Sequence, residues 1–154
     1  MDRDATREVL QALEAHGVRY AIFGGVAVNL HGLVRATLDL DVFVAPDVEN
    51  VARLRAALHS VFDDVSIDEI TAEDLLGEYP AVQYVPPEGS FHLDILTRLG
   101  EAFRWGDLET ERLPFDGLDV TVVTPRQLYL MKKDTVRPKD RIDAEELRRR
   151  YGLA

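Results

Sequence analysis

Apolar and polar residues follow two periods along this chain, one typical of helices and one typical of strands. Helical spacing and capping residues predict helices over residues 6–16, 26–31, 47–61, 124–133 and 137–152, with a short helical turn at 71–76. Two-residue alternation predicts strands over residues 18–23, 37–44, 81–85, 91–96, 107–113 and 118–123. Because strands and helices interleave without a strict β-α-β order, we expect an α+β fold with one mixed β-sheet and helices packed on it.

The length and composition of the chain narrow its class. A chain of 154 residues is expected to form a single domain, residues 1–154, that needs no disulfide or metal to fold. The absence of cysteine excludes thiolate metal sites, thiol nucleophiles and disulfides. The charged start and the lack of an apolar run of roughly 18 residues predict a cytoplasmic protein with no membrane segment.

The charge of the chain is unevenly distributed. Asp plus Glu total 28 against 18 for Lys plus Arg, and the net charge of −10 argues against a nonspecific nucleic-acid binder. Residues 126–150 nevertheless hold nine basic and five acidic residues, so the predicted helical segment 125–151 is a basic C-terminal part on an acidic body. Such an arrangement suits an enzyme that needs a metal and acts on a polyanionic substrate.

Two carboxylates share one face of the strand predicted over residues 37–44. Positions 38, 40, 42 and 44 are apolar, so Asp39 and Asp41 lie on the opposite face, one strand repeat apart. Adjacent anions on a half-buried strand repel each other and favour a cation, and oxygen ligands without thiols suit Mg²⁺ or Mn²⁺. A solvated polar face is the alternative, and the Asp-x-Asp pattern alone favours it.

A second strand repeats this design. In the strand predicted over residues 91–96, Asp94 lies opposite the apolar Phe91, Leu93 and Ile95. Asp is disfavoured inside strands, yet both predicted strands carry it between apolar neighbours. If the two strands are adjacent, the three carboxylates converge and are able to hold two divalent ions, as in phosphoryl transfer.

A pair of glycines supplies a complementary phosphate site. Gly24 and Gly25 lie where a predicted strand turns into a short helix, and such a turn presents backbone N–H groups to a phosphate. Glycine also permits close backbone approach and positive φ. By itself a Gly-Gly pair is typical of ordinary turns, but this one comes one short helix before the acidic strand.

In this order the motifs resemble the signature of small nucleotidyltransferases of the polymerase-β-like superfamily. The superfamily pattern is a Gly-Gly or Gly-Ser turn, a strand with paired acidic residues and a strand with a third acidic residue. Its parts are matched by Gly24-Gly25, Asp39/Asp41 and Asp94. The chain is most similar to the branch that contains the AbiEii/AbiGii-type toxins, and residues 132–143 resemble that branch's Lys…Arg-x-Lys-Asp-x-x-Asp segment. The resemblance covers about residues 18–147.

The resemblance implies a nucleotidyltransferase (polymerase-β-like) fold and an EC 2.7.7-type enzyme, which moves NMP from an NTP to an acceptor hydroxyl and releases pyrophosphate. It implies that Asp39 and Asp41 hold two Mg²⁺ ions, with Mn²⁺ as the alternative, and that Asp94 completes the metal site. Asp94 would also take the proton of the acceptor hydroxyl during in-line attack on the α-phosphate.

The resemblance also assigns residues to the bound NTP. Gly24 and Gly25 would contact the triphosphate through backbone amides, and Lys132 falls where the family places a phosphate-contacting lysine. The remaining positions are Asp140 near the nucleotide, Arg35 for phosphate contact and Thr37 for strand ordering. Many superfamily members have Ser in place of Gly25, so the phosphate contact of that hydroxyl is missing here.

The sequence leaves the acceptor open among RNA or tRNA 3′ ends, a hydroxyl of a partner protein, and a small molecule such as an aminoglycoside. A toxin of a two-gene toxin–antitoxin system, with a cognate antitoxin or toxin partner, is the leading hypothesis. A small-molecule nucleotidyltransferase is the second. A non-catalytic member that binds a nucleotide or a partner is the third, although the intact acidic and glycine motifs count against it.

The histidines show no metal-ligand spacing. His31, at the end of a short apolar helix, is interpreted as a structural residue, and His16, His59 and His92 as surface or capping residues. The arginines at 148–150 suit the dipole at the end of the last helix, so we expect them to be solvated.

Overall fold

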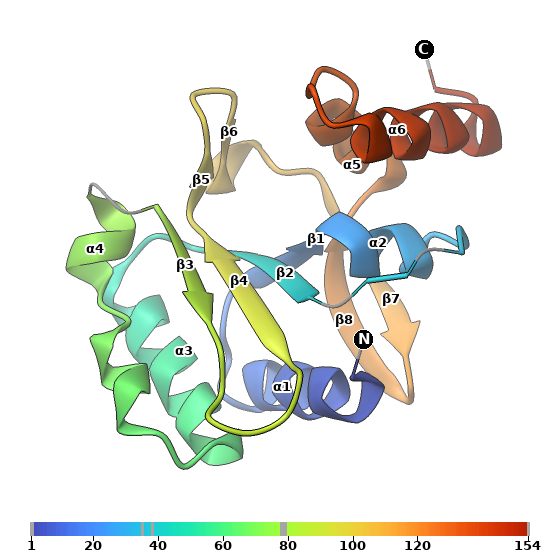
Figure 1. Cartoon of the computed structure of the whole chain (residues 1–154). Coiled ribbons are helices and arrows are strands. Elements are labelled where there is room, and N and C mark those ends of the chain that lie inside the picture. Colours follow the sequence, from blue (N-terminus) through green and yellow to red (C-terminus); the bar gives the residue numbers. More distant parts are fainter. Residues whose placement is uncertain (1, 35, 38, 78–79, 154) are drawn as a thin grey trace.

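Helices and strands interleave in the computed structural model, which describes residues 2–34, 36–37, 39–77 and 80–153 (Figure 1). The helices are α1 (Arg3–Ala15), α2 (Gly24–Leu30), α3 (Val48–Val61), α4 (Ala72–Leu76), α5 (Pro125–Lys132) and α6 (Pro138–Tyr151), with 3₁₀ turns η1 (Val65–Glu69) and η2 (Trp105–Asp107). The strands are β1 (Tyr20–Phe23), β2 (Asp39–Val44), β3 (Ala81–Tyr84), β4 (His92–Leu96), β5 (Arg98–Leu99), β6 (Phe103–Arg104), β7 (Thr110–Phe115) and β8 (Leu118–Val123). The predicted α+β class is confirmed.

The large sheet has the strand order β3-β4-β2-β1-β8-β7, and β5 pairs with β6 in a separate hairpin. β2 pairs with β4 in parallel and with β1 in antiparallel orientation, so the two Asp-bearing strands are neighbours. The remaining pairs are β1 with β8 in parallel, and β3 with β4 and β7 with β8 in antiparallel orientation. The prediction of one mixed sheet is therefore confirmed for the strands that carry the acidic residues.

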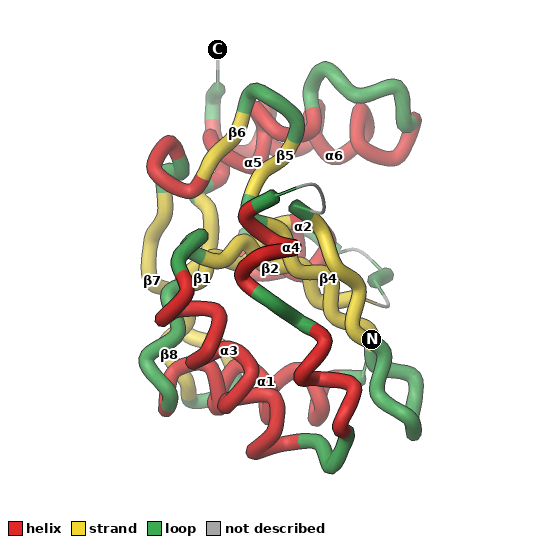
Figure 2. Tube along the Cα trace, turned by 90° about the vertical axis from the view of Figure 1, so that its left-hand side faces the viewer, coloured by secondary structure: helices red, strands yellow, loops and turns green. Residues whose placement is uncertain are grey.

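Helices lie on both sides of this sheet (Figures 1 and 2). α1 and α3 pack against each other on one side, whereas α2 packs on β1 and β2, and α5 packs on α6 beyond it. Leu40 and Val42 of β2 are fully buried, as the two-residue pattern predicts. Within the described ranges, no helix has the length and apolar content to cross a membrane.

Capping side chains set where the first and third helices begin. Asp2 accepts a hydrogen bond from the Ala5 amide at 2.9 Å, so α1 begins at Arg3 rather than at residue 6. The predicted N-cap Asp47 is confirmed, because its Oδ1 accepts a hydrogen bond from the Asn50 amide at 2.8 Å. Short polar side chains ahead of apolar-periodic segments therefore mark helix starts in this chain.

The structure differs from prediction in the hairpins. β5 and β6 have two residues each, which is too short to show alternation in the sequence. β7 runs to Phe115, past the predicted end at residue 113. The reason is the turn, in which Asp116 and Gly117 have φ of 47° and 82° and so form the left-handed two-residue turn that suits a tight hairpin.

Candidate active site

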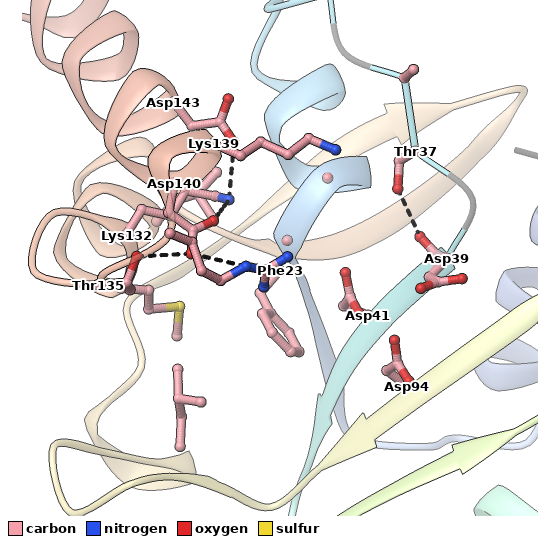
Figure 3. A pocket seen from close by; sticks show the side chains of 17 residues that line it. Phe23, Thr37, Asp39, Asp41, Asp94, Lys132, Thr135, Lys139, Asp140 and Asp143 are labelled. Carbon is pink, nitrogen blue, oxygen red and sulfur yellow. Dashed lines mark hydrogen bonds and ion pairs between the residues drawn. The ribbon is translucent and has the colours of Figure 1, made fainter.

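The acidic strands bring their carboxylates to one side of the sheet. Asp41 is opposite Asp94 in the parallel register of β2 and β4, and Asp39 lies one repeat earlier, opposite His92. Figure 3 shows Asp39, Asp41 and Asp94 facing the same pocket, which all three line. The prediction that Asp94 shares a face with the Asp pair on a neighbouring strand is therefore confirmed.

The turn from β1 into α2 approaches these carboxylates so closely that it has no room for side chains. Gly24 has φ of +68°, and a Cβ there would overlap Asp41 Oδ2 and lie 2.8 Å from Asp41 Cγ. A Cβ at Gly25 would lie 2.6 Å from Thr37 Oγ1. The sheet register sets this position, because Phe23 is the Cα partner of Asp41. The Gly-Gly pair is thus required by close approach to the acidic strand.

Asp41 lies in an unfavourable environment for a carboxylate. Burial, hydrogen-bond contact with Asp94 and the charges of Asp94 and Asp39 raise the pKa of Asp41 to about 8, while Lys132 acts in the opposite direction. From the neighbouring strand β3, Gln83 Nε2 donates a hydrogen bond to Asp94 Oδ1 at 3.1 Å. Negative charge is therefore crowded into a half-buried site.

Asp39 has a histidine as its cross-strand neighbour. His92 Nδ1 lies 3.2 Å from Asp39 Oδ1. The two atoms are not aligned as a hydrogen bond, so this buried oxygen has no hydrogen-bond partner within the described structure. The interpretation of His92 as a surface or capping residue misses this contact, because the contact depends on the register of β2 against β4.

The donor set fits a divalent cation. Carboxylate oxygens are the ligands that Mg²⁺ prefers, and both the repulsion at Asp41 and the unpartnered oxygen of Asp39 would be relieved by positive charge. Among the described residues, however, no three His, Cys, Asp or Glu side chains are gathered closely enough to hold a metal ion as they stand. Asp41 and Asp94 are in contact, but the Asp39 carboxylate lies against His92, so the three-carboxylate metal site remains a prediction.

Lys132 is anchored between α5 and α6. Its side chain is 11% exposed, and its Nζ donates to Asp140 Oδ1 and to Asp143 Oδ2, at 3.1 Å each. Thr135 Oγ1 donates to the other oxygen of Asp140 at 2.9 Å. Burial acts to raise the pKa of Asp140, but the hydrogen bonds from Lys132 and Thr135 outweigh it and hold that pKa below its ordinary value. An ammonium has three N–H donors, so a third remains for a ligand.

One pocket of about 900 Å³ joins the acidic strands, the glycine turn and this lysine (Figure 3). Its volume is near the upper end of ligand pockets, which span about 300–1,000 Å³. Arg137 and Lys139 of the α6 region also line it. The carboxylates and the basic residues thus stand at different walls of the same pocket.

The other predicted nucleotide-binding positions are partly accounted for. Thr37 lines the pocket, and its hydroxyl donates to the Asp39 carbonyl oxygen at 3.2 Å at the start of β2, as expected of a residue that orders the strand. Asp140 lines the pocket next to Lys132. Arg35 lies outside the described residues, so its predicted phosphate contact stays a prediction.

Asp143 is a site residue to which the sequence pattern assigns no role. It is 3% exposed and binds Lys132, but its only sequence signal is its place at the end of the segment that resembles the toxin branch.

The interpretation of His31 as a structural residue is confirmed, because its buried ring Nε2 lies 2.7 Å from the Val123 carbonyl oxygen.

Comparisons with known proteins find matches in structure and none in sequence. No protein-family sequence profile matches the chain, and no curated protein matches it. The lincomycin-bound lincosamide antibiotic adenylyltransferase LnuA has a TM-score of 0.62 at 12% identity, with 100% of this chain and 99% of that chain covered. The antigenic nucleotidyltransferase-like protein of Paracoccidioides brasiliensis has a TM-score of 0.57 at 21% identity, with 99% and 77% covered.

ANT(2″)-Ia in complex with adenylyl-2″-tobramycin is a third match, with a TM-score of 0.55 at 15% identity and with 94% of this chain and 86% of that chain covered. At sequence identities this low, structural similarity supports a conclusion about the fold alone. The three matches cover 94–100% of this chain, so the similarity extends over nearly all of its length. The chain has the nucleotidyltransferase fold.

Proposed function

We propose that this chain is a metal-dependent nucleotidyltransferase that moves NMP from an NTP to an acceptor hydroxyl and releases pyrophosphate. The observation that carries the proposal is the contact of Asp41 with Asp94 in a pocket that is also lined by the glycine turn and Lys132. Crowded carboxylates that fit a divalent cation, facing an anchored ammonium, suit a bound triphosphate. The nucleotidyltransferase fold supports the same reaction.

In the proposed reaction one P–O bond forms and another breaks. Asp94 accepts the proton of the acceptor hydroxyl, and that oxygen bonds to the α-phosphorus. The bond from the α-phosphorus to the bridging oxygen breaks, and pyrophosphate leaves with the electron pair. Lys132 donates its third N–H to a phosphate oxygen and offsets the charge there.

Asp39, Asp41 and Asp94 would hold the metal, which supplies neutralisation of charge on the phosphoryl oxygens when bound. Mg²⁺ is the expected ion, and Mn²⁺ shares its preference for oxygen ligands. Gly24 and Gly25 keep the backbone of α2 close to the acidic strand, so a phosphate at this turn would lie beside the carboxylates.

Transfer from α-labelled NTP in the presence of Mg²⁺ tests this proposal. Asp94→Asn is expected to slow transfer by about 10²–10⁴-fold, the range for loss of a general base, and Asp39→Asn/Asp41→Asn is expected to abolish it. Asp63→Asn, the same change at an exposed residue, is the matched control and should retain activity. Absence of both transfer and Mg²⁺-dependent NTP binding, with RNA, protein and aminoglycoside acceptors, would reject the proposal.

For the acceptor, the leading proposal is an RNA or tRNA 3′ end or a protein hydroxyl, in a toxin–antitoxin pair. A small-molecule acceptor is the second candidate, favoured by the lincomycin and adenylyl-2″-tobramycin carried by the LnuA and ANT(2″)-Ia structures. Growth arrest on expression that Asp41→Ala relieves is expected of the toxin. Antibiotic resistance without growth arrest, lost in the same variant, is expected of the small-molecule enzyme.

A further inference from the structure

The β5–β6 hairpin carries two arginines without a partner in the described structure. Arg98 and Arg104 are directly opposite each other in the antiparallel register, and both are exposed. Neither side chain makes a hydrogen bond, ion pair or ring contact, whereas the side chain of every other arginine in the described ranges makes at least one. Like charges directly opposite each other destabilise a strand pair, so the hairpin bears a cost that no described contact offsets.

The other face of the hairpin fixes it beside the active-site pocket. Leu99 and Phe103 are also opposite each other, and both are half-buried and pack against the core. Leu99 lines the pocket itself. Arg98 follows Asp94 by four positions. Because an extended chain spans about 3.3–3.6 Å per residue, the Cα atoms of these two residues lie within about 14 Å.

The hairpin has a basic counterpart across the pocket. Figures 1 and 2 both place it at the same end of the sheet as α5 and α6. Arg137 and Lys139, at the start of α6, line the pocket. Arg98 and Arg104 are not among the residues that line the pocket; they lie just outside it, on the hairpin face opposite Leu99, in a chain whose net charge is −10.

We propose that Arg98 and Arg104 bind a phosphate group of the acceptor while the acceptor hydroxyl lies at Asp94. Two adjacent guanidinium groups match the oxygens of a phosphate in geometry and charge. A stacked nucleic-acid strand carries one phosphate per about 3.4 Å, so a strand whose 3′ end reaches Asp94 passes the pair within about four nucleotides. This inference depends on the proposed transfer reaction in one respect: it takes the acceptor of that reaction to be the molecule that carries the phosphate.

Binding of a short single-stranded RNA with a free 3′ hydroxyl, labelled at its 5′ end and measured by fluorescence anisotropy without NTP, tests the pair. We expect Arg98→Gln/Arg104→Gln to weaken binding by about tenfold or more, because charge-assisted contacts to phosphate are lost. The logarithmic salt dependence should also become shallower by about 0.7, since the pair binds one phosphate and each phosphate contacted on a single strand contributes about 0.7. NTP binding should not change.

Arg148→Gln/Arg149→Gln is the matched control, because it removes the same charge from two exposed arginines that pair with Glu145. It should leave RNA binding within about twofold, as expected for a change of distant charge in salt. Arg98→Lys/Arg104→Lys keeps the charge and should keep the salt dependence. Thermal unfolding of each variant verifies that the fold is retained.

Calorimetric titration with inorganic phosphate distinguishes the source of the phosphate. Loss of RNA binding in the glutamine pair and not in the control assigns the site to a nucleic-acid acceptor. Pair-dependent binding of inorganic phosphate with no effect on RNA assigns it to a phosphorylated small acceptor. Equal behaviour of both double variants with both probes overturns the proposal. Because binding is measured without NTP, this failure is distinct from a failure of nucleotidyl transfer.

Discussion

Gly24 has no space for even one methyl group next to Asp41. Its φ is +68°, and a Cβ would overlap the Asp41 carboxylate. We expect Gly24→Ala to lower the free energy of unfolding. Backbone strain alone accounts for about 1–2 kcal/mol, and the displacement of Asp41 by the new methyl group adds to that loss. Urea unfolding measures the loss. Gly152→Ala is the control, since Gly152 has φ of +63° with nothing within 4 Å of its Cβ; equal losses would argue against the clash.

Removal of the Lys132 ammonium would take an ion-pair partner from the half-buried Asp140 and from the buried Asp143. We expect Lys132→Met to lower the free energy of unfolding at pH 7 by about 3 kcal/mol, the scale for breaking a buried ion pair. Lys133→Met should cost about 0–1 kcal/mol, because the pair of Lys133 with Asp134 is exposed.

The cost of Lys132→Met should depend on pH. Because Lys132 holds the pKa of Asp140 below its ordinary value, this contribution is fully present above the unfolded pKa near 3.8 and is lost as the pH falls through the folded pKa. Urea unfolding at neutral and at acid pH measures the difference between the wild type and the variant. A difference that does not shrink below about pH 4 would show that the network acts through packing alone.

Single residues could be predicted as far as the face on which they lie. The two-residue period places Asp39, Asp41 and Asp94 on one side of their strands. The contact of Asp39 with His92 needs the register of two strands, and that of Asp143 with Lys132 needs the packing of two helices. The local sequence pattern determines neither strand register nor helix packing, so these two side-chain contacts could not be predicted.

At the scale of elements, Glu14 joins the end of α1 to the β7–β8 hairpin. Arg112 donates to both of its oxygens, at 2.8 and 3.0 Å, and the Tyr20 hydroxyl donates at 2.7 Å. Hydrogen bonds from Arg112 lead the causes that hold the pKa of Glu14 below its ordinary value. The stability that this contact contributes is therefore present above the unfolded pKa near 4.5 and is lost as the pH falls through the folded pKa.

We expect Glu14→Gln to lower the free energy of unfolding by about 1 kcal/mol at pH 7, a value discounted because both partners are partly exposed. The loss should shrink at acid pH, as the pH falls through the lowered folded pKa of Glu14 and the carboxylate of the wild type takes up a proton. Glu8→Gln, at an exposed position of the same helix, should have little effect at either pH. Urea unfolding curves at both pH values decide between these outcomes.

Elements with strong local signals were predictable, and short ones were not. Asp47 and the apolar residues after it predict α3, and β2 and β4 follow from alternation. β5 and β6 have two residues each and are held by Leu99 and Phe103 against the core, so their existence depends on tertiary contact. The same hairpin carries Arg98 and Arg104, which the sequence pattern does not single out.

At the scale of the molecule, the order of motifs predicts the fold better than overall sequence similarity does. The matched structures share 12–21% identity with this chain, yet their TM-scores lie between 0.55 and 0.62. The fold constrains a glycine turn, the faces of two strands and an apolar core, and few side chains beyond these. The acceptor depends on surface residues that the fold leaves free to vary, so the sequence could not predict it.

Bound nucleotide is expected to stabilise the whole chain. At about 100 times its Kd, a ligand adds about 2.7 kcal/mol to the free energy of unfolding, which for this chain length raises Tm by about 5–10 °C. Thermal scans with a non-hydrolysable ATP analogue and Mg²⁺ measure the shift. EDTA and the Asp39→Asn/Asp41→Asn variant should each remove most of it. A shift that survives both would exclude these carboxylates as ligands of the metal.

The contact between Asp41 and Asp94 also has a consequence for biosynthesis. The two residues lie on adjacent parallel strands, but α3, η1, α4 and β3 come between them in the chain. Such non-local pairing forms slowly, because a long connection must close before the strands meet. Lys132 is made later still. A growing chain therefore has no complete pocket until α5 has emerged from the ribosome, and a chain interrupted before that point carries the acidic strands without the lysine that lines the same pocket.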